Sequence, residues 1–355
     1  MNLTLAIPNR RNAVVIASMS VGLFITILFS LSIGAVSIPV DEVWAILLRR
    51  LGFFPHREFD TMHAVVMDSI RIPRITMTIL IGAALGISGA CLQGLFRNPL
   101  VEPSLIGVSG GSAAGVVMVV VFGSALAIEK NSFLYNALLP LTAFGGGILA
   151  TFMVLNLSLQ MRRTNIAVLV LVGVAINALA GALIGLAIFY ADENQLRTFT
   201  FWTLGDLGGA TPEKLFIAAP LLLLSTISLL FYAPSLNALA LGESEAFHMG
   251  VDVEKVKRVI VLLSALGVGV SVSLAGIIGF VGLVVPHLVR VLFHADNRLV
   301  LPASVLGGAW LLVVADLIAR TIVTPAELPI GVVTSLIGTP FFIALLMKAK
   351  LKNEL

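Results

Sequence analysis

RIPRITMTILIGAALGISGACLQGLFRNPLVEPSLIGVSGGS, residues 71 to 112, is the stretch that decides the fold of this chain. Two arginines stand at its start. The uncharged run that follows, from Ile75 to Phe96, is long enough to cross a bilayer. A polar break, Arg97-Asn98-Pro99, separates this run from a second apolar run that begins near Pro103. The pattern predicts a membrane hairpin with a basic mouth on one side and a tight turn on the other.

Small residues in the first run indicate how its helix packs. Gly82 and Gly86 are four residues apart, and Gly89 follows closely. This spacing places small residues on one side of a helix, where they allow a neighbouring backbone to approach closely within lipid. Cys91, the single cysteine, lies in the same run and therefore cannot form an intrachain disulfide.

The composition is that of a membrane protein with many spans. Of the 355 residues, 58% are hydrophobic and only 12% are charged, and the mean hydropathy is +1.05. Such a chain is too apolar to bind nucleic acid, and no part of it reads as a separate soluble domain. We therefore expect residues 1–355 to form one membrane domain. It contains no G-x-x-x-x-G-K-[ST] motif, and we expect no catalytic residue, no metal and no cofactor.

The uncharged runs predict ten membrane helices and the side on which the chain ends. They fall at 13–40, 75–96, 103–128, 131–161, 164–191, 215–242, 259–289, 299–315 and 328–347. The run 259–289 is too long for one upright helix, and we divide it near Gly276. With ten helices, both Arg10-Arg11 and the terminal lysines Lys348, Lys350 and Lys352 lie in the cytoplasm, as the positive-inside rule favours. We expect the first helix to be retained, because its apolar run is longer than that of a cleaved signal.

Two segments resemble each other across the chain. The residues from Arg97 to Ala113 are similar to those from Asp296 to Trp310. In the ten-helix topology the helices that precede them run in opposite directions. Transporters often consist of inverted repeats of this kind, so we expect two inverted halves.

Three arginines are expected at the outer side. Arg71 and Arg74 flank Pro73 at the mouth of the second helix, and Arg320 follows Asp316 at the end of the ninth. Long basic side chains at such places often extend to the membrane interface. Alternatively, guanidinium groups held in place recognise carboxylates on a partner protein.

A second candidate site is the cytoplasmic segment 242–258. It mixes charged residues with apolar ones, among them Phe247 and Met249. The pattern predicts a short helix, a break at Gly250 and another short helix. A solvated loop is one interpretation, but apolar side chains in a charged frame favour a protein contact.

The amino-acid sequences of these stretches closely resemble those of the FecCD-type permease family. Members of this family are the membrane subunits of ABC importers for ferric siderophores, heme and cobalamin. The matching strings occur in order along nearly the whole chain: 71–112, 242–251, 276–290, 315–320 and 327–342. The resemblance implies an all-α inner-membrane permease that works as a homodimer. It also implies two copies of a separate cytoplasmic ATPase, a periplasmic substrate-binding protein, and a path on the dimer axis lined by the fifth and tenth helices.

The resemblance also implies roles for both candidate sites. Arg71, Arg74 and Arg320 match the family's arginines that meet acidic residues on the two lobes of the binding protein. The residues that match its coupling helices, which occupy a groove of the ATPase, are Gly242, Glu243, Ala246, Phe247, Met249, Gly250 and Val251. Arg97-Asn98-Pro99 is expected to support the same cytoplasmic face.

The cargo depends on one string. LRTFTFWTLG, from Leu196 to Gly205, looks more like the heme branch of the family than the siderophore branch, although its aromatic residues also suit a membrane-interface belt. Heme is therefore the expected cargo, and a ferric siderophore or cobalamin is the alternative. An ion-coupled secondary transporter is a more distant alternative. It would need carboxylates buried within helices, of which Asp316 is the clearest case.

Overall fold

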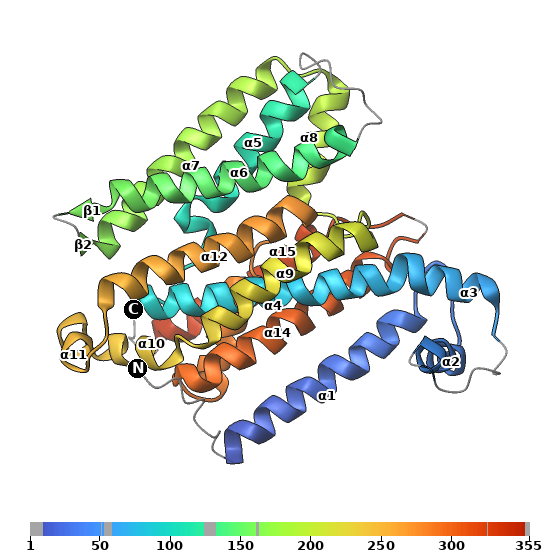
Figure 1. Ribbon diagram of the computed structural model, residues 1–355, viewed down its shortest axis with the longest axis horizontal. Helices are drawn as coiled ribbons and strands as arrows, with labels where there is room; N and C mark the ends of the chain where they lie inside the picture. The colour runs from blue at the N-terminus through green and yellow to red at the C-terminus, as the bar shows by residue number, and fades with distance from the viewer. Residues whose placement is uncertain are drawn as a thin grey trace.

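The computed structural model describes residues 10–50, 52, 59–123, 133–160, 163–324 and 326–351, which form a bundle of helices (Figure 1). The helices and the two short strands are, in chain order, α1 (Arg10–Ser32), α2 (Val40–Arg50), α3 (Thr61–Val66), the π-helical turn Met67–Arg71, α4 (Ile72–Phe96), the 3-10 turn Pro103–Ile106, α5 (Val108–Phe122), α6 (Phe133–Leu157), β1 (Leu159–Gln160), β2 (Arg163–Thr164), α7 (Ile166–Phe189), α8 (Glu193–Leu204), α9 (Pro212–Leu230), α10 (Ala233–Leu241), α11 (Glu243–His248), α12 (Val253–Ala275), α13 (Val281–Leu292), α14 (Asn297–Ala319) and α15 (Ile330–Leu351).

The helix α4 is the centre of the bundle. It packs against α9, α12, α13 and α14, and most of its residues are buried. A Cβ atom at Gly82 or Gly86 would collide with the backbone of α14, and one at Gly89 would collide with the backbone of Gly282 in α13. The close helix approach predicted from the glycine spacing is therefore confirmed.

In the part of the chain that the structure describes, ten apolar helices correspond to the ten predicted spans. Seven are long and apolar enough to cross a membrane, with bounds 10–32, 61–96, 137–157, 166–189, 212–230, 253–275 and 297–319, and three shorter ones lie at 108–122, 281–292 and 330–344. The predicted division near Gly276 is also confirmed. Gly276 has φ of +69° and Phe280 has φ of +67°, so the chain turns between α12 and α13.

Two boundaries differ from the prediction. The second arm of the hairpin begins its α-helix at Val108 rather than near Pro103, because residues 103–106 form a 3-10 turn and Gly107 has φ of +83°. The run 215–242 is not one helix. Helix α9 ends at Leu230, and Pro234 stands in the first turn of the next helix, α10. Proline lacks the amide hydrogen that a continued helix would need, so α9 does not extend through this position.

The bundle has two distinct ends. At one end lie α10, α11, the β1–β2 hairpin and the start of α1, and at the other end lie α2 and α3 (Figure 1). The start of α1 is held by a contact of 3.0 Å between Asn12 Oδ1 and His294 Nε2, just before α14. We call the α11 end the inner end and the α3 end the outer end. Helices α5 to α8 form a layer of their own, which contacts α12 through α5 and α6.

Candidate functional site

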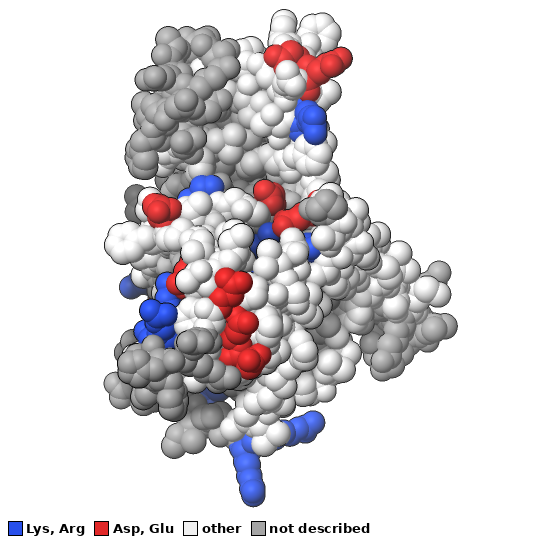
Figure 2. All heavy atoms as spheres, turned by 90° about the vertical axis from the view of Figure 1, so that its right-hand side faces the viewer, with Lys and Arg blue, Asp and Glu red and all other residues white. Residues whose placement is uncertain are grey.

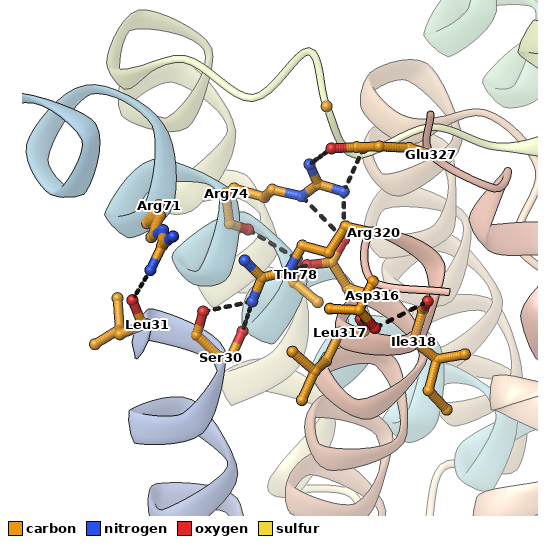
Figure 3. A network of polar contacts seen from close by, with 12 residues as sticks. Ser30, Leu31, Arg71, Arg74, Thr78, Asp316, Leu317, Ile318, Arg320 and Glu327 are labelled. Carbon is orange, nitrogen blue, oxygen red and sulfur yellow. Dashed lines mark hydrogen bonds and ion pairs between the residues drawn. The ribbon is translucent and has the colours of Figure 1, made fainter. Parts of the chain in front are cut away.

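The outer arginines are carried by two helix ends that lie together. Helix α3 continues through the turn 67–71 into α4, so Arg71 and Arg74 belong to one continuous helix. Pro73 lies two residues after the π-helical turn Met67–Arg71, at the point where the regular α-helix α4 begins. Arg320 is the C-cap residue of α14. Figure 3 shows how these side chains converge.

Arg74 holds two carboxylates at once. Its Nε and Nη2 atoms donate to Asp316 Oδ1 at 3.0 and 2.7 Å. Its Nη1 donates to Glu327 Oε1 at 2.9 Å, and Nη2 lies 2.9 Å from Glu327 Oε2. Charge-assisted contacts of this forked kind are the stronger class of hydrogen bond, so Arg74 joins α4 firmly to the end of α14 and to the segment before α15.

The other two arginines bind mainly to the last turn of α1 and the chain just after it. Arg320 Nη2 donates to the carbonyl oxygen of Ser30 and, at 2.6 Å, to its Oγ, while Arg320 Nε lies 3.5 Å from Asp316 Oδ2. Arg71 donates to the carbonyl oxygens of Leu31 and Val36. The two guanidinium groups leave little room for a side chain at position 34, because a Cβ at Gly34 would lie 3.1 Å from Arg71 and 3.2 Å from Arg320.

All three arginines are buried within one copy of the chain. Arg71 is 4% exposed, Arg74 and Arg320 are each 8% exposed, and Asp316 is 1% exposed. They are therefore at the outer end, as the sequence predicts, but their heads are paired inside the protein rather than extended to the membrane interface. Figure 2 shows this end, where acidic side chains form separate patches. Binding-protein docking by these arginines stays a prediction.

Glu327 is the residue of this network that sequence reasoning missed. Its side chain is 44% exposed, whereas the Asp316 side chain is 1% exposed. The residue occurs in one of the matching strings, yet nothing in the local pattern marks it as a partner of Arg74, which lies 253 residues earlier. Beside it opens a hollow of about 740 Å³, whose charged lining residues are Arg74, Asp206, Lys214 and Glu327.

The string from Leu196 to Gly205 forms most of α8. Asp192 and Gln195 make a capping box at its start, and Gln195 also donates to the carbonyl oxygen of Val121 in α5 at 3.1 Å. Within the helix, the rings of Phe199 and Trp202 stack at 6.4 Å. These contacts fix α8 at the outer end of α7.

A second hollow, of about 580 Å³, lies between the end of α8 and the start of α15. It is lined by apolar, small and hydroxyl residues, namely Thr203, Leu204, Ile277, Gly279, Gly331, Val332, Ser335, Leu336, Thr339 and Pro340. No lining residue carries a charge. In the ten-helix topology α15 is the tenth helix, one of the two that the family resemblance implies as the lining of the path, whereas the fifth, α7, gives none of the lining residues named here. A path at this hollow stays a prediction.

The predicted coupling segment forms the inner end of the molecule. Helix α11 closes with a Schellman motif, in which Val251 N donates to the carbonyl oxygen of Ala246 at 3.0 Å and Gly250 has φ of +82°. Ala246 is buried, whereas Phe247 is 69% and Met249 is 63% exposed. The break at Gly250 and the exposed apolar pair agree with the prediction.

The second short helix of this segment was predicted wrongly. Val253 begins α12, which continues for 23 residues into the bundle. Asp252 caps this helix by accepting from Lys255 N at 3.1 Å, and no proline interrupts the helix before it ends at Gly276. The segment is therefore one short helix, a glycine turn and the first turns of a membrane helix.

Lys257 anchors this segment and was also missed. It is buried, and its Nζ donates to the carbonyl oxygen of Thr164 at 2.9 Å and to Glu243 Oε2 at 2.8 Å, and lies 3.3 Å from Glu254 Oε1. Glu254 Oε2 accepts from Thr164 N at 2.7 Å. The start of α11 and α12 are thereby tied to the β1–β2 hairpin.

A large hollow at the inner end joins several of these residues. It has a volume of about 1160 Å³, and its lining includes Arg97, Asn98, Thr164, Glu243 and Lys257. Arg97 and Asn98 thus lie on the same inner face as the segment 242–258. The face combines charged groups with the exposed side chains of α11.

Comparison with known proteins places this geometry in a family. The model of the FecCD transport family matches residues 22–348. The chain is 40% identical over 328 residues to a hemin transport system permease of Yersinia pestis, covering 92% of this chain and 93% of the relative. It is 39% identical over 282 residues to a cobalamin import system permease of Halobacterium salinarum, covering 79% and 73%. It is 37% identical over 330 residues to a molybdate import system permease of Haemophilus influenzae, covering 92% and 94%.

Among solved structures, a metal-chelate type ABC transporter in an inward-facing conformation matches with a TM-score of 0.78 and 33% identity, over 94% of this chain and 98% of that one. An ion-coupled secondary transporter is therefore excluded, in keeping with the pairing of Asp316 to two arginines. The chain belongs to the FecCD transport family and is a multi-pass inner-membrane permease subunit of an ABC importer.

Proposed function

We propose that this permease imports heme as a homodimer, driven by two copies of a separate ATPase. Permeases of this family work with ATPase and substrate-binding partners. The observation that carries the cargo is the string 196–205, which forms α8 and contributes Thr203 and Leu204 to the uncharged hollow of about 580 Å³. A relative that is 40% identical over 92% of this chain is a hemin permease.

The lining of that hollow suits a large, mostly apolar cargo. Its side chains are aliphatic or carry hydroxyl groups. A flat apolar macrocycle can lie on such a wall without a fixed charge that would hold it, and a transport path needs this weak retention. In a homodimer with α15 of each copy beside the axis, two such walls would face each other.

The two ends of the molecule suit the two partners. At the inner end, the exposed Phe247 and Met249 offer an apolar contact in a charged frame, which fits a groove on an ATPase. At the outer end, the network of Arg71, Arg74 and Arg320 places the Arg74 guanidinium beside the hollow of about 740 Å³, where it can meet an acidic residue of a binding protein, while Arg71 and Arg320 hold the chain around it.

A second cargo, cobalamin, is favoured by the relative from Halobacterium salinarum at 39% identity. Growth tests distinguish heme from cobalamin and from a ferric siderophore as the cargo. A strain without this gene should lose growth on heme as sole iron source and keep the use of a ferric siderophore and of cobalamin. Restoring the wild-type gene should restore growth on heme, whereas Phe247→Asp, a change at the inner end far from the path, should not. Loss of cobalamin or siderophore use instead of heme use would overturn the heme assignment and leave the importer class intact.

A further inference from the structure

The two carboxylates on Arg74 differ in how freely they could leave it. Asp316 lies within α14 and its side chain is 1% exposed. Glu327 lies in the segment between α14 and α15, and its side chain is 44% exposed. Both of its carboxylate oxygens face Arg74, at 2.9 Å each. An ion pair with one exposed member contributes less net stability than a fully buried one, because water competes for the carboxylate of Glu327.

The charges of the network require a carboxylate at the place of Glu327. Among the described residues, the ion pairs of Arg74 and Arg320 involve two carboxylates, Asp316 and Glu327, whereas the neighbouring Arg71 donates to backbone carbonyl oxygens. Without Glu327 the buried cluster would hold three positive charges against one negative charge. A buried excess of like charge is unfavourable, so a departing Glu327 has to be replaced by another anion.

The surroundings weaken the hold of Glu327. A Cβ at Gly208 would lie 3.1 Å from Asp206 Oδ1 and 3.6 Å from Glu327 Oε2, so both carboxylates lie near one point. Their like charges repel each other. The hollow of about 740 Å³ on this side is lined by both of them and by Lys214, and it gives a side chain from outside a way to Arg74.

We propose that Glu327 is an exchangeable internal counter-ion of Arg74, and that a carboxylate of the docking partner displaces it. The proposal rests on the proposed function, which supplies a partner at the outer end. The partner is recognised as a protein surface that presents a carboxylate, because the group it replaces is a carboxylate held by a forked guanidinium. Arg71 and Arg320 are unsuited to such exchange, since they donate mainly to backbone carbonyl oxygens within the chain.

Displacement of Glu327 would affect the segment that leads into α15, next to the proposed path. The next residue, Leu328, donates through its backbone to Ala319 at 2.9 Å, and Ile330 donates to the carbonyl oxygen of Gly205 at 3.1 Å. The segment that carries Glu327 therefore joins the end of α14 to the end of α8 and begins α15. Docking on Arg74 would thus release the tie between α4 and the segment that begins α15, whose first residues line the hollow of about 580 Å³.

Chemical modification of Arg74 tests the exchange without any partner. The full-length permease in nanodiscs is treated with phenylglyoxal, and modification of each arginine is followed by peptide mass spectrometry. Glu327→Ala should speed modification of Arg74 about fivefold, the value expected for losing a half-exposed ion pair. Sodium acetate should slow it again in a saturable manner, because acetate fills the vacated place. Glu213→Ala, which removes an exposed carboxylate in the first turn of α9, is the matched control and should leave Arg74 unchanged.

A measurement on the wild type guards against misfolding of the variant. Raising sodium chloride from about 50 to about 500 mM screens an exposed ion pair. Modification of Arg74 should therefore speed up with salt, while that of Arg71 and Arg320 should not. Equal rates in wild type and Glu327→Ala, no protection by acetate, or a salt response shared by all three arginines would each overturn the proposal. None of these readouts uses heme or ATP, so their failure leaves the import of heme standing, and a failure of heme growth leaves the exchange standing.

Discussion

Replacing Asp316 with asparagine should destabilise the permease strongly. The change keeps the shape of the side chain and removes its charge. The carboxylate accepts from Arg74 at 2.7 and 3.0 Å and lies 3.5 Å from Arg320. Asparagine would also present an amide NH₂ group to two guanidinium groups that can only donate.

The magnitude follows from burial. The side chains of Asp316, Arg74 and Arg320 are 1%, 10% and 8% exposed, so water screens the loss very little. Breaking a buried ion pair by removing one partner costs about 3–5 kcal/mol. Glu327 still compensates Arg74 in part, and we therefore expect the lower end, about 3 kcal/mol, in the free energy of unfolding.

Thermal unfolding of the purified permease in nanodiscs measures this loss. About 3 kcal/mol should lower the midpoint by roughly 4 °C in a chain of this size, because the unfolding entropy grows with chain length. Asp68→Asn is the matched control, because Asp68 forms an exposed pair with Arg50 at 3.6 Å, where the same change should cost about 0–1 kcal/mol. If Asp316→Asn loses no more than Asp68→Asn, then Asp316 does not hold the arginines as a charged group and the reasoning fails.

Three further outcomes are expected. Gly89→Val should abolish folding into a monodisperse permease, because its side chain would collide with the backbone of Gly282, whereas Gly181→Val, with open space around it, should purify normally in size-exclusion chromatography. Phe247→Asp should prevent co-purification of the ATPase and abolish uptake while leaving the melting midpoint unchanged, and a variant that assembles and transports normally would contradict a coupling role. A reporter that is active only in the periplasm should give no activity when fused to the C-terminus, and a strong signal there would remove the ten-helix topology.

The membrane hairpin could be predicted because its determinants are local. The uncharged run, the spacing of Gly82 and Gly86 and the polar break all lie within one short stretch, and each acts on its own neighbourhood in the chain. The division near Gly276 could be predicted for the same reason, from helix length alone. The start of α5 at Val108 could not, because it depends on the left-handed conformation of Gly107, which an apolar run does not reveal.

The partners of the charged residues could not be predicted, because they are far apart in sequence. Arg74 meets Asp316 across 242 residues, and Lys257 meets Thr164 across 93. An arginine at a helix mouth has the same local pattern whether it faces solvent, lipid headgroups or a buried carboxylate. The predicted topology therefore places the three arginines at the same end of the molecule, as the structure does, but leaves their pairing open.

This pairing changes how docking should be tested. Charge reversal at Arg74 would place a third carboxylate against Asp316 and Glu327, and uncompensated charge buried there costs several kcal/mol, whereas a rim ion pair with a partner contributes about 0–1 kcal/mol. The loss of folding stability is then larger than the loss of binding energy. Weak capture of a binding protein by such a variant would therefore indicate a damaged outer end rather than a lost contact. Glu327 avoids this difficulty, because its removal frees Arg74 on the exposed side while Asp316 keeps the guanidinium in place. If Arg74 receives a carboxylate of the binding protein, removing Glu327 should strengthen capture of that protein, whereas a purely structural role for the network predicts weaker capture or none.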